Sequence, residues 1–198
     1  MANEYGTLAA LKERVGIQAD DTTADTLLTS ALAAASRGID RATGRRFWLD
    51  AEPVARIYRP RGRIVYEPDG VLFLVDDIGS AEGLSVETGS GTSWSLATGY
   101  DTSPDNALLD GRPITGLLRA SGSWGSATGR LRVTARFGWP AVPDDITEAA
   151  LIQASRLYKR KDSPEGIIGS AEWGVRNLSR RDPDVWALIE PFILPGFG

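Results

Sequence analysis

Hydrophobic residues recur with helical spacing in the first part of the chain. The first apolar positions lie three and four residues apart, at Leu8, Leu11 and Val15. Thr7 is a cap candidate for this helix, and Gly16 is its expected end. A longer helical pattern follows four cap candidates at Asp20–Thr23 and ends at Gly44. Its apolar face consists of Leu28, Ala31, Leu32, Ala35, Ile39 and Ala42. The many alanines predict that a neighbouring helix approaches this face closely.

After Arg45 the helical period stops, and a stretch rich in Gly, Ser, Thr and Pro follows. Strict alternation of apolar and polar residues predicts a half-buried strand at Arg130–Phe137. The continuously apolar run Val71–Val75 predicts a strand that is covered on both sides. Weaker strand candidates are Ile57–Tyr58 and Ile64–Tyr66, and expected hairpin or loop tips are Thr88–Ser95 and Ser121–Gly129. The middle of the chain therefore predicts a small sheet or barrel.

The helical period returns at Pro143, which is favourable in a first turn, with Asp144–Asp145 at the positive end of the helix dipole. The apolar face of this helix consists of Ile146, Ala150, Leu151, Ala154, Leu157 and Tyr158. The helix ends in the cations Lys159–Lys161, and a loop punctuated by glycines is expected at Asp162–Arg181. Asp182–Pro183 then begins a short helix whose apolar residues cover most of its circumference.

Together these elements predict an α+β fold. A chain of 198 residues is long enough for one core that carries a substantial insertion. We expect a small antiparallel helical bundle built from the two chain ends, with a β-rich insertion between the second and third main helices. The expected parts are residues 1–49 for the N-terminal helices, 50–140 for the insert, and 141–198 for the C-terminal helices with their loop and tail.

The composition restricts the possible chemistry. The chain has no cysteine and no histidine, which excludes disulfides, thiolate nucleophiles and imidazole bases, and zinc sites built on these ligands. The formal net charge of -4 argues against a general nucleic-acid binder, because such binding depends on a surplus of cations. No apolar run predicts a signal peptide or a transmembrane helix. We expect a protein without a cofactor or metal that stays where it is made.

Three acidic pairs could provide carboxylates for a metal site or for hydrolysis. Asp20–Asp21 and Asp144–Asp145 precede helices, so capping explains them without any catalytic role. Asp76–Asp77 follows the predicted buried strand and is better placed for a site, although aspartates at strand ends commonly form turns. The segment Gly89–Thr92 lacks the lysine and the following helix that a phosphate-binding loop requires.

A basic cluster is the strongest charge feature of the chain. Its members are Arg156, Lys159, Arg160, Lys161, Arg176, Arg180 and Arg181. The cluster fits a solvated helix end and, equally well, a contact with an acidic partner or with DNA phosphates. Trp173 lies in the glycine-rich segment, where a large ring has little local core to join. Burial of that ring against another subunit is our preferred interpretation.

The two helical ends resemble the head-to-tail connector family of long-tailed bacteriophages, also called adaptor or head-completion proteins. The resemblance rests on Leu27–Phe47 (LLTSALAAASRGIDRATGRRF), on Val142–Ile168 (VPDDITEAALIQASRLYKRKDSPEGII) and on Leu178–Phe192. The middle of the chain fits the family only as a variable β insert. The resemblance implies a structural virion protein, not an enzyme. By this resemblance we expect the protein to form a ring beneath the portal, commonly twelve-fold, that connects the DNA-filled head to the tail and extends the DNA channel.

The resemblance also implies the partners and the surfaces that bind them. Partners are the portal protein, neighbouring copies and the next neck or tail-completion protein, while DNA passes through the channel without sequence-specific binding. The expected subunit interface comprises Ile167, Ile168, Trp173, Val175, Arg176 and Arg180. The expected portal-docking residues are Trp186, Ile189, Phe192, Ile193, Leu194 and Phe197, in a tail whose apolar strip is costly to expose on a monomer.

Two other functions remain open at this level. One is a tail-side completion protein of the same neck, and the other is a carboxylate-dependent hydrolase with its site at Asp76–Asp77 on the insert. The resemblance implies location at the head-tail interface of the virion, after assembly in the host cytoplasm and without a membrane partner.

Overall fold

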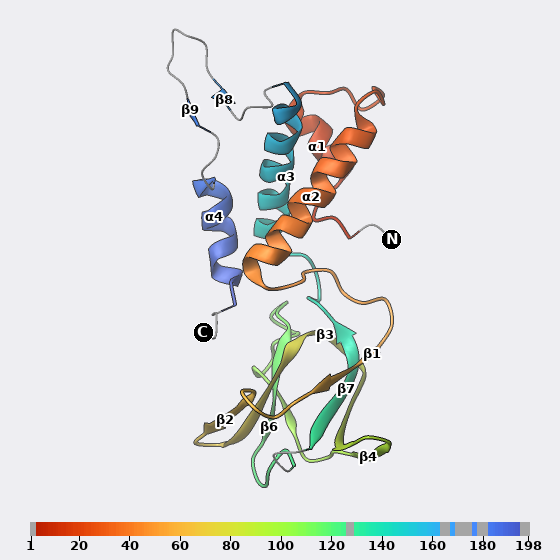
Figure 1. The fold of residues 1–198 in the computed structure, drawn as a ribbon, viewed down its shortest axis with the longest axis vertical. Coiled ribbons are helices and arrows are strands. Elements are labelled where there is room, and N and C mark those ends of the chain that lie inside the picture. Colours follow the sequence, from red (N-terminus) through yellow and green to blue (C-terminus); the bar gives the residue numbers. More distant parts are fainter. Residues whose placement is uncertain (1–2, 126–128, 163–166, 169–175, 178–181, 195–198) are drawn as a thin grey trace. The chain divides into compact units, whose positions relative to one another are not determined.

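The computed structural model describes residues 3–125, 129–162, 167–168, 176–177 and 182–194. The chain divides into two compact units (Figure 1). Residues Met1–Arg45 and Val142–Gly198 form the first, which we call the helical unit, and Arg46–Ala141 form the second, the β unit. The fold is α+β. None of the described helices is long and apolar enough to cross a membrane.

The helices of the helical unit begin and end close to the predicted residues. They are α1 (Leu8–Val15), α2 (Asp25–Thr43), α3 (Asp144–Lys159) and α4 (Pro183–Ile189), with 3-10 turns η1 (Arg160–Asp162) and η2 (Glu190–Phe192). The Thr7 hydroxyl accepts a hydrogen bond from the Ala10 amide at the start of α1. Gly16 and Gly44 end α1 and α2 with φ of 78° and 69°, a left-handed conformation that favours glycine.

Two details of α2 differ from the sequence prediction. The residues Asp20–Thr23 do not cap the helix, because α2 begins only at Asp25 and its N-cap residue is Ala24. Asp21 instead accepts hydrogen bonds from the hydroxyl and amide of Thr23, and these bonds lower the pKa of its carboxyl. At the other end Ala42 is exposed and Thr43 is buried. Burial of Thr43 is possible because its hydroxyl donates to the Ile39 carbonyl, 2.9 Å away.

Small residues allow close packing of α2 on α3, and α3 in turn packs against α1 and α4. The buried face of α3 differs slightly from the predicted one, since Ala149 is buried while Leu157 and Tyr158 are only half-buried. The core of the helical unit consists of Tyr5, Leu11, Leu28, Ala31, Leu32, Ala35, Ile39, Ile146, Ala149, Ala150, Leu151, Ala154, Val185 and Ile189. The alanines at the contact surfaces bring the two helices together with little side-chain volume between them.

The β unit contains one antiparallel sheet of seven strands among its described residues. The strands are β1 (Val54–Tyr58), β2 (Ile64–Glu67), β3 (Gly70–Ser90), β4 (Ser93–Leu96), β5 (Asp101–Ser103), β6 (Ile114–Arg119) and β7 (Arg130–Phe137). Their order is β1-β7-β3-β6-β5, and β2 and β4 pair with opposite ends of β3 (Figure 1). The predicted strand Arg130–Phe137 is confirmed together with its alternating burial.

The long strand β3 organises this sheet. Its first part pairs with β2 and β6, and its second part pairs with β7 and β4. Register shifts between Leu74 and Ile78 and again between Ile78 and Ser85 allow the strand to change partners, because bulges bend and twist a strand. The sheet encloses one core, whose largest fully buried residues include Phe73, Trp124 and Phe137.

The sheet is larger than the one predicted from the sequence. The run Val71–Val75 is a strand, but Val71 and Leu74 are half-buried, so cover on both sides is incomplete. That strand also continues through Asp76–Asp77 to Ser90, and β4, β5 and β6 were not predicted. The tip at Thr88–Ser95 is confirmed as the β3–β4 hairpin, in which Ser90 pairs with Ser93.

Candidate assembly interface

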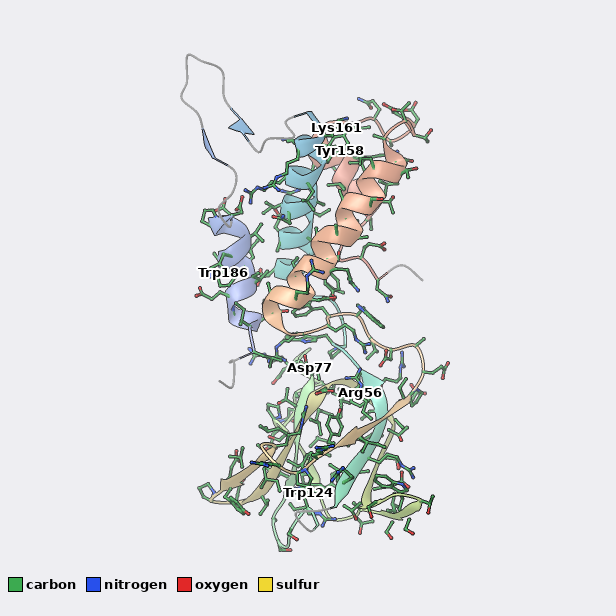
Figure 2. The ribbon with its side chains drawn as sticks, viewed as in Figure 1. Arg56, Asp77, Trp124, Tyr158, Lys161 and Trp186 are labelled. Atoms are coloured by element: carbon green, nitrogen blue, oxygen red, sulfur yellow. The ribbon has the colours of Figure 1, made fainter. Side chains whose placement is uncertain are left out.

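The helical unit contains a groove bounded by α2, α3 and α4. Its volume is about 640 Å³. We call it the α2–α3–α4 groove; Figure 2 labels Trp186 on the α4 side. The lining residues are Ala34, Ala35, Gly38, Ile39, Arg41, Ala42, Gln153, Arg156, Leu157, Arg160, Asp182, Val185, Trp186 and Ile189. An opening of this size can accept side chains from another polypeptide.

Small residues form the α2 wall of the groove. Ala34, Gly38 and Ala42 are spaced four apart and therefore share one helix face. A Cβ added at Gly38 would have no heavy atom within 4 Å, apart from its own helix backbone and chain neighbours. The opposite wall is apolar and comes from α4, where Val185 and Ile189 are buried and Trp186 is half-buried. The wall of small residues thus leaves space that the described residues of the subunit do not fill.

Charged residues line the groove near the α3–α4 connection. Arg156 pairs with Asp182 at 2.9 Å, and Asp182 also caps α4 by accepting from the amides of Asp184 and Val185. One carboxylate therefore fixes the beginning of α4 against α3. Arg41 and Arg160 add two further cations to the lining, so three arginines stand against a single aspartate.

The chain after α4 lies against the end of α2. The Leu194 amide donates to the Thr43 carbonyl at 2.9 Å, and Arg45 Nε donates to the Phe192 carbonyl at 2.8 Å. Leu194 remains 43% exposed beside Gly44. Tertiary contacts thus hold this segment as far as Leu194, the last residue of the described range.

The residues expected to dock on the portal have different positions. Ile189 is 3% exposed and packs in the core of its own subunit, where it also lines the α2–α3–α4 groove. Its burial could not be predicted, because apolar residues cover most of the circumference of this short helix and the sequence does not show which of them face the core. Trp186, Phe192 and Ile193 are half-buried, and Phe197 lies outside the described residues.

The expected subunit interface falls on the segment Asp162–Arg181. It contains two short strands, β8 (Ile167–Ile168) and β9 (Arg176–Asn177), rather than only a loop. They pair antiparallel, with Ile167 opposite Asn177 and Ile168 opposite Arg176, and they form a two-stranded sheet of their own. The other expected interface residues, Trp173, Val175 and Arg180, lie outside the described part of the chain.

The carboxylates of Asp76–Asp77 do not form a shared site. They lie within β3, not at a strand end. Asp76 pairs with Arg56 at 2.8 Å and with Arg63 at 3.4 Å, and it accepts from the Tyr58 hydroxyl. Burial, with the nearby Asp76 charge, raises the pKa of Tyr58. Asp77 accepts from Trp139 Nε1 at 3.1 Å instead, and Figure 2 labels Arg56 and Asp77 in the β unit.

An ion-pair network extends from Asp76 through the β unit. The chain of contacts runs Arg46–Asp50–Arg56–Asp76–Arg63. This network could not be predicted from the sequence, because its members come from distant positions with no common motif. Across the described residues, no group of three Asp or Glu side chains could hold a metal ion. The network has the features of a structural element that holds β1 and the following turn to β3.

Replacing Asp76 by Asn should therefore reduce stability rather than abolish a reaction. The change removes charge-assisted bonds to Arg56 and Arg63, and we expect it to lower the free energy of unfolding by roughly 1 to 2 kcal/mol. Asp77→Asn is the matched control, because its amide oxygen can still accept from Trp139. Urea unfolding measures both variants. Full stability of Asp76→Asn combined with loss of particle infectivity would instead favour the hydrolase.

Comparisons with known proteins identify similar folds. The chain is similar to a chain of the virion of a native gene transfer agent particle, with a TM-score of 0.55 and 22% identity. It is also similar to a chain of the neck of an empty gene transfer agent particle computed with C6 symmetry, with a TM-score of 0.52 and 18% identity. Each match covers 96% of this chain and 91% of the other. No protein-family profile and no curated protein matches the chain. At these identities the matches establish a shared fold.

Proposed function

We propose that this protein is a structural, non-enzymatic subunit of the neck of a phage-like particle. It forms a ring beneath the portal, connects the DNA-filled head to the tail and extends the DNA channel. The observation that carries this proposal is the likeness to the gene transfer agent chains, which spans 96% of this chain and so includes both units. The connector-like motifs at Leu27–Phe47 and Val142–Ile168 support it independently.

A ring requires two different contact surfaces on each subunit, because head-to-tail contacts close by rotation. In the proposed subunit the two chain ends form the helical bundle of the ring. Neighbours meet through the segment Asp162–Arg181, and the tail beyond α4 holds the portal. The C6 symmetry of the similar neck is compatible with a twelve-fold ring, since twelve is a multiple of six.

The charge of the protein fits a channel through which DNA slides. A strongly basic lumen would hold phosphates tightly, whereas this chain has a formal net charge of -4. We therefore propose passage of DNA without sequence-specific binding. The subunit assembles in the host cytoplasm and remains at the head-tail interface of the virion.

Electron microscopy of portal-bearing heads with and without the purified protein tests this proposal. We expect a ring of additional density at the portal, and we expect such heads to join tails. Density only at the end of isolated tails would contradict it and would favour the tail-side completion protein.

A further inference from the structure

The turn between β1 and β2 carries a surface that is both basic and apolar. Residues 54–63 contain four arginines and no acidic residue, although the whole chain has a formal net charge of -4. Arg59 and Arg61 are exposed and form no ion pair with any described residue. Ile57, two residues before Arg59, is 61% exposed. We call Ile57, Arg59 and Arg61 the basic patch.

The basic patch has a fixed conformation. Pro60 lies between its two arginines and is buried, and the Pro60 carbonyl accepts a hydrogen bond from the Arg63 amide at 3.0 Å. Asp76 pairs with Arg56, which Figure 2 labels, before the turn and with Arg63 after it. A surface that is rigid before binding loses little conformational entropy when a partner binds.

The loop between β5 and β6 carries a surface of the opposite charge. Residues 101–112 contain three aspartates and one arginine, so this region is net acidic. Asp105 and Asp110 are exposed and form no ion pair with any described residue. Leu109, the residue before Asp110, is 85% exposed. We call Asp105, Leu109 and Asp110 the acidic patch.

Backbone hydrogen bonds keep the loop around Leu109 in place. The Asp110 amide donates to the Asn106 carbonyl at 3.0 Å, and the Arg112 amide donates to the Ala107 carbonyl at 2.8 Å. Ala107 is 4% exposed and belongs to the core, so it anchors the loop on the β unit. Covering a leucine that a rigid loop holds in water lowers the free energy.

We propose that the basic patch of one subunit binds the acidic patch of the next subunit. This inference rests on the ring proposed above, and it adds a contact between β units to the contact through Asp162–Arg181. Leu109 packs against Ile57, and opposite charges surround this apolar contact. Exposed ion pairs contribute little affinity, so burial of the two apolar side chains stabilises the contact and the charges fix its orientation.

The distribution of charge favours a head-to-tail contact. Neither patch is complementary to itself, so two copies cannot pair the same patch about a two-fold axis. The patches follow β1 and β5, the strands at the two ends of the order β1-β7-β3-β6-β5. Among the described residues no ion pair joins the patches within one subunit. Each subunit therefore offers one patch to each of two neighbours, as a ring requires.

A second acidic turn, between β2 and β3, fits a ring less well. It carries Glu67 and Asp69 beside Tyr66, which is 82% exposed. The four-residue strand β2 joins this turn to the basic patch, so the two lie only about 13 Å apart along one strand. Two copies could pair these charges in both directions about a two-fold axis, which gives a dimer. The β2–β3 turn therefore provides a control.

Reversal of charge tests whether the contact joins two copies. One variant carries Arg59→Glu and Arg61→Glu, and the other carries Asp105→Arg and Asp110→Arg. Each should keep the parent's melting temperature, because the changed side chains are exposed. Each should require at least roughly tenfold more protein to form rings on portal-bearing heads. An equal mixture of the two variants should restore ring formation, because alternating subunits again bring opposite charges together.

The matched control mixes the Arg59→Glu, Arg61→Glu variant with a Glu67→Arg, Asp69→Arg variant, which has the same net charge as the aspartate variant. This mixture should not form rings. Rescue by the control mixture, or no rescue by the first mixture, would overturn the contact. Normal rings from the arginine variant would also overturn it, and weaker DNA binding by those rings would assign the arginines to DNA phosphates instead.

Leu109→Ser provides a second measurement without a change of charge. The variant should keep the parent's melting temperature, because Leu109 is exposed, and it should weaken ring formation at least roughly tenfold. Normal ring formation by Leu109→Ser would overturn the contact and leave the neck function intact. Failure of the parent protein to form any ring would overturn both proposals.

Discussion

A protein that ends at Leu194 should fold normally and fail to join portal-bearing heads to tails. The shortened chain keeps the Leu194–Thr43 and Arg45–Phe192 hydrogen bonds, so the helical unit retains its described contacts. Loss of the four residues after Leu194 should change the free energy of unfolding by less than about 0.5 kcal/mol. The same deletion removes Phe197, the last aromatic residue of the proposed portal contact.

Calorimetry and an in vitro head-tail joining assay check the two parts of this prediction. The melting temperature should change by less than about 2 °C, while joined particles should fall to background. A longer deletion that begins at Pro191 is the comparison, because it also removes the contacts with Thr43 and Arg45 and should lower stability. Normal joining by the protein that ends at Leu194 would show that the last four residues do not hold the portal.

Trp124→Ala should produce the largest loss of stability in the β unit. Trp124 is 1% exposed, its Nε1 donates to the Val71 carbonyl at 2.8 Å, and its ring meets the edge of Phe73 with centroids 6.0 Å apart. Removal of so large a buried ring leaves a cavity and should cost about 3 to 5 kcal/mol. Because a typical protein is stable by only about 5 to 15 kcal/mol, this loss is a large fraction of the total stability.

Urea unfolding of the β unit measures this loss against two controls. Trp124→Phe keeps most of the apolar volume but leaves the Val71 carbonyl without its donor, so an intermediate loss of about 1 to 3 kcal/mol is expected. Tyr66→Ala removes a ring that is 82% exposed and should change stability by less than about 0.5 kcal/mol. A Trp124→Ala protein as stable as Tyr66→Ala would refute the central role of this ring in the core.

Local signals predicted the helical elements well. A threonine cap and a left-handed glycine bracket α1, Gly44 ends α2, and Asp182 caps α4, so each of these four boundaries is encoded within a few residues. The strand Arg130–Phe137 was equally clear, because its buried and exposed positions alternate along its length. Features that depend on sequence neighbours alone could therefore be predicted.

Features that depend on distant residues could not be predicted. β3 continues through Asp76–Asp77 because arginines of the β1–β2 region and Trp139 satisfy these carboxylates. The alanine and glycine positions of α2 indicated close helix packing, yet only the tertiary structure distinguishes the buried Ala35 from the half-buried Gly38. Likewise, the buried position of Ile189 depends on how α4 packs on α3.

The Arg156–Asp182 pair makes the helical unit insensitive to the length of the segment between them. Because Asp182 fixes α4 to α3 at the base of that segment, its two ends stay together whatever lies between. Closing a flexible loop of twice the length costs only about 0.6 kcal/mol more. The segment can therefore differ in length without redesign of the helices, and in the proposed ring a change of its length would alter the spacing between neighbouring subunits.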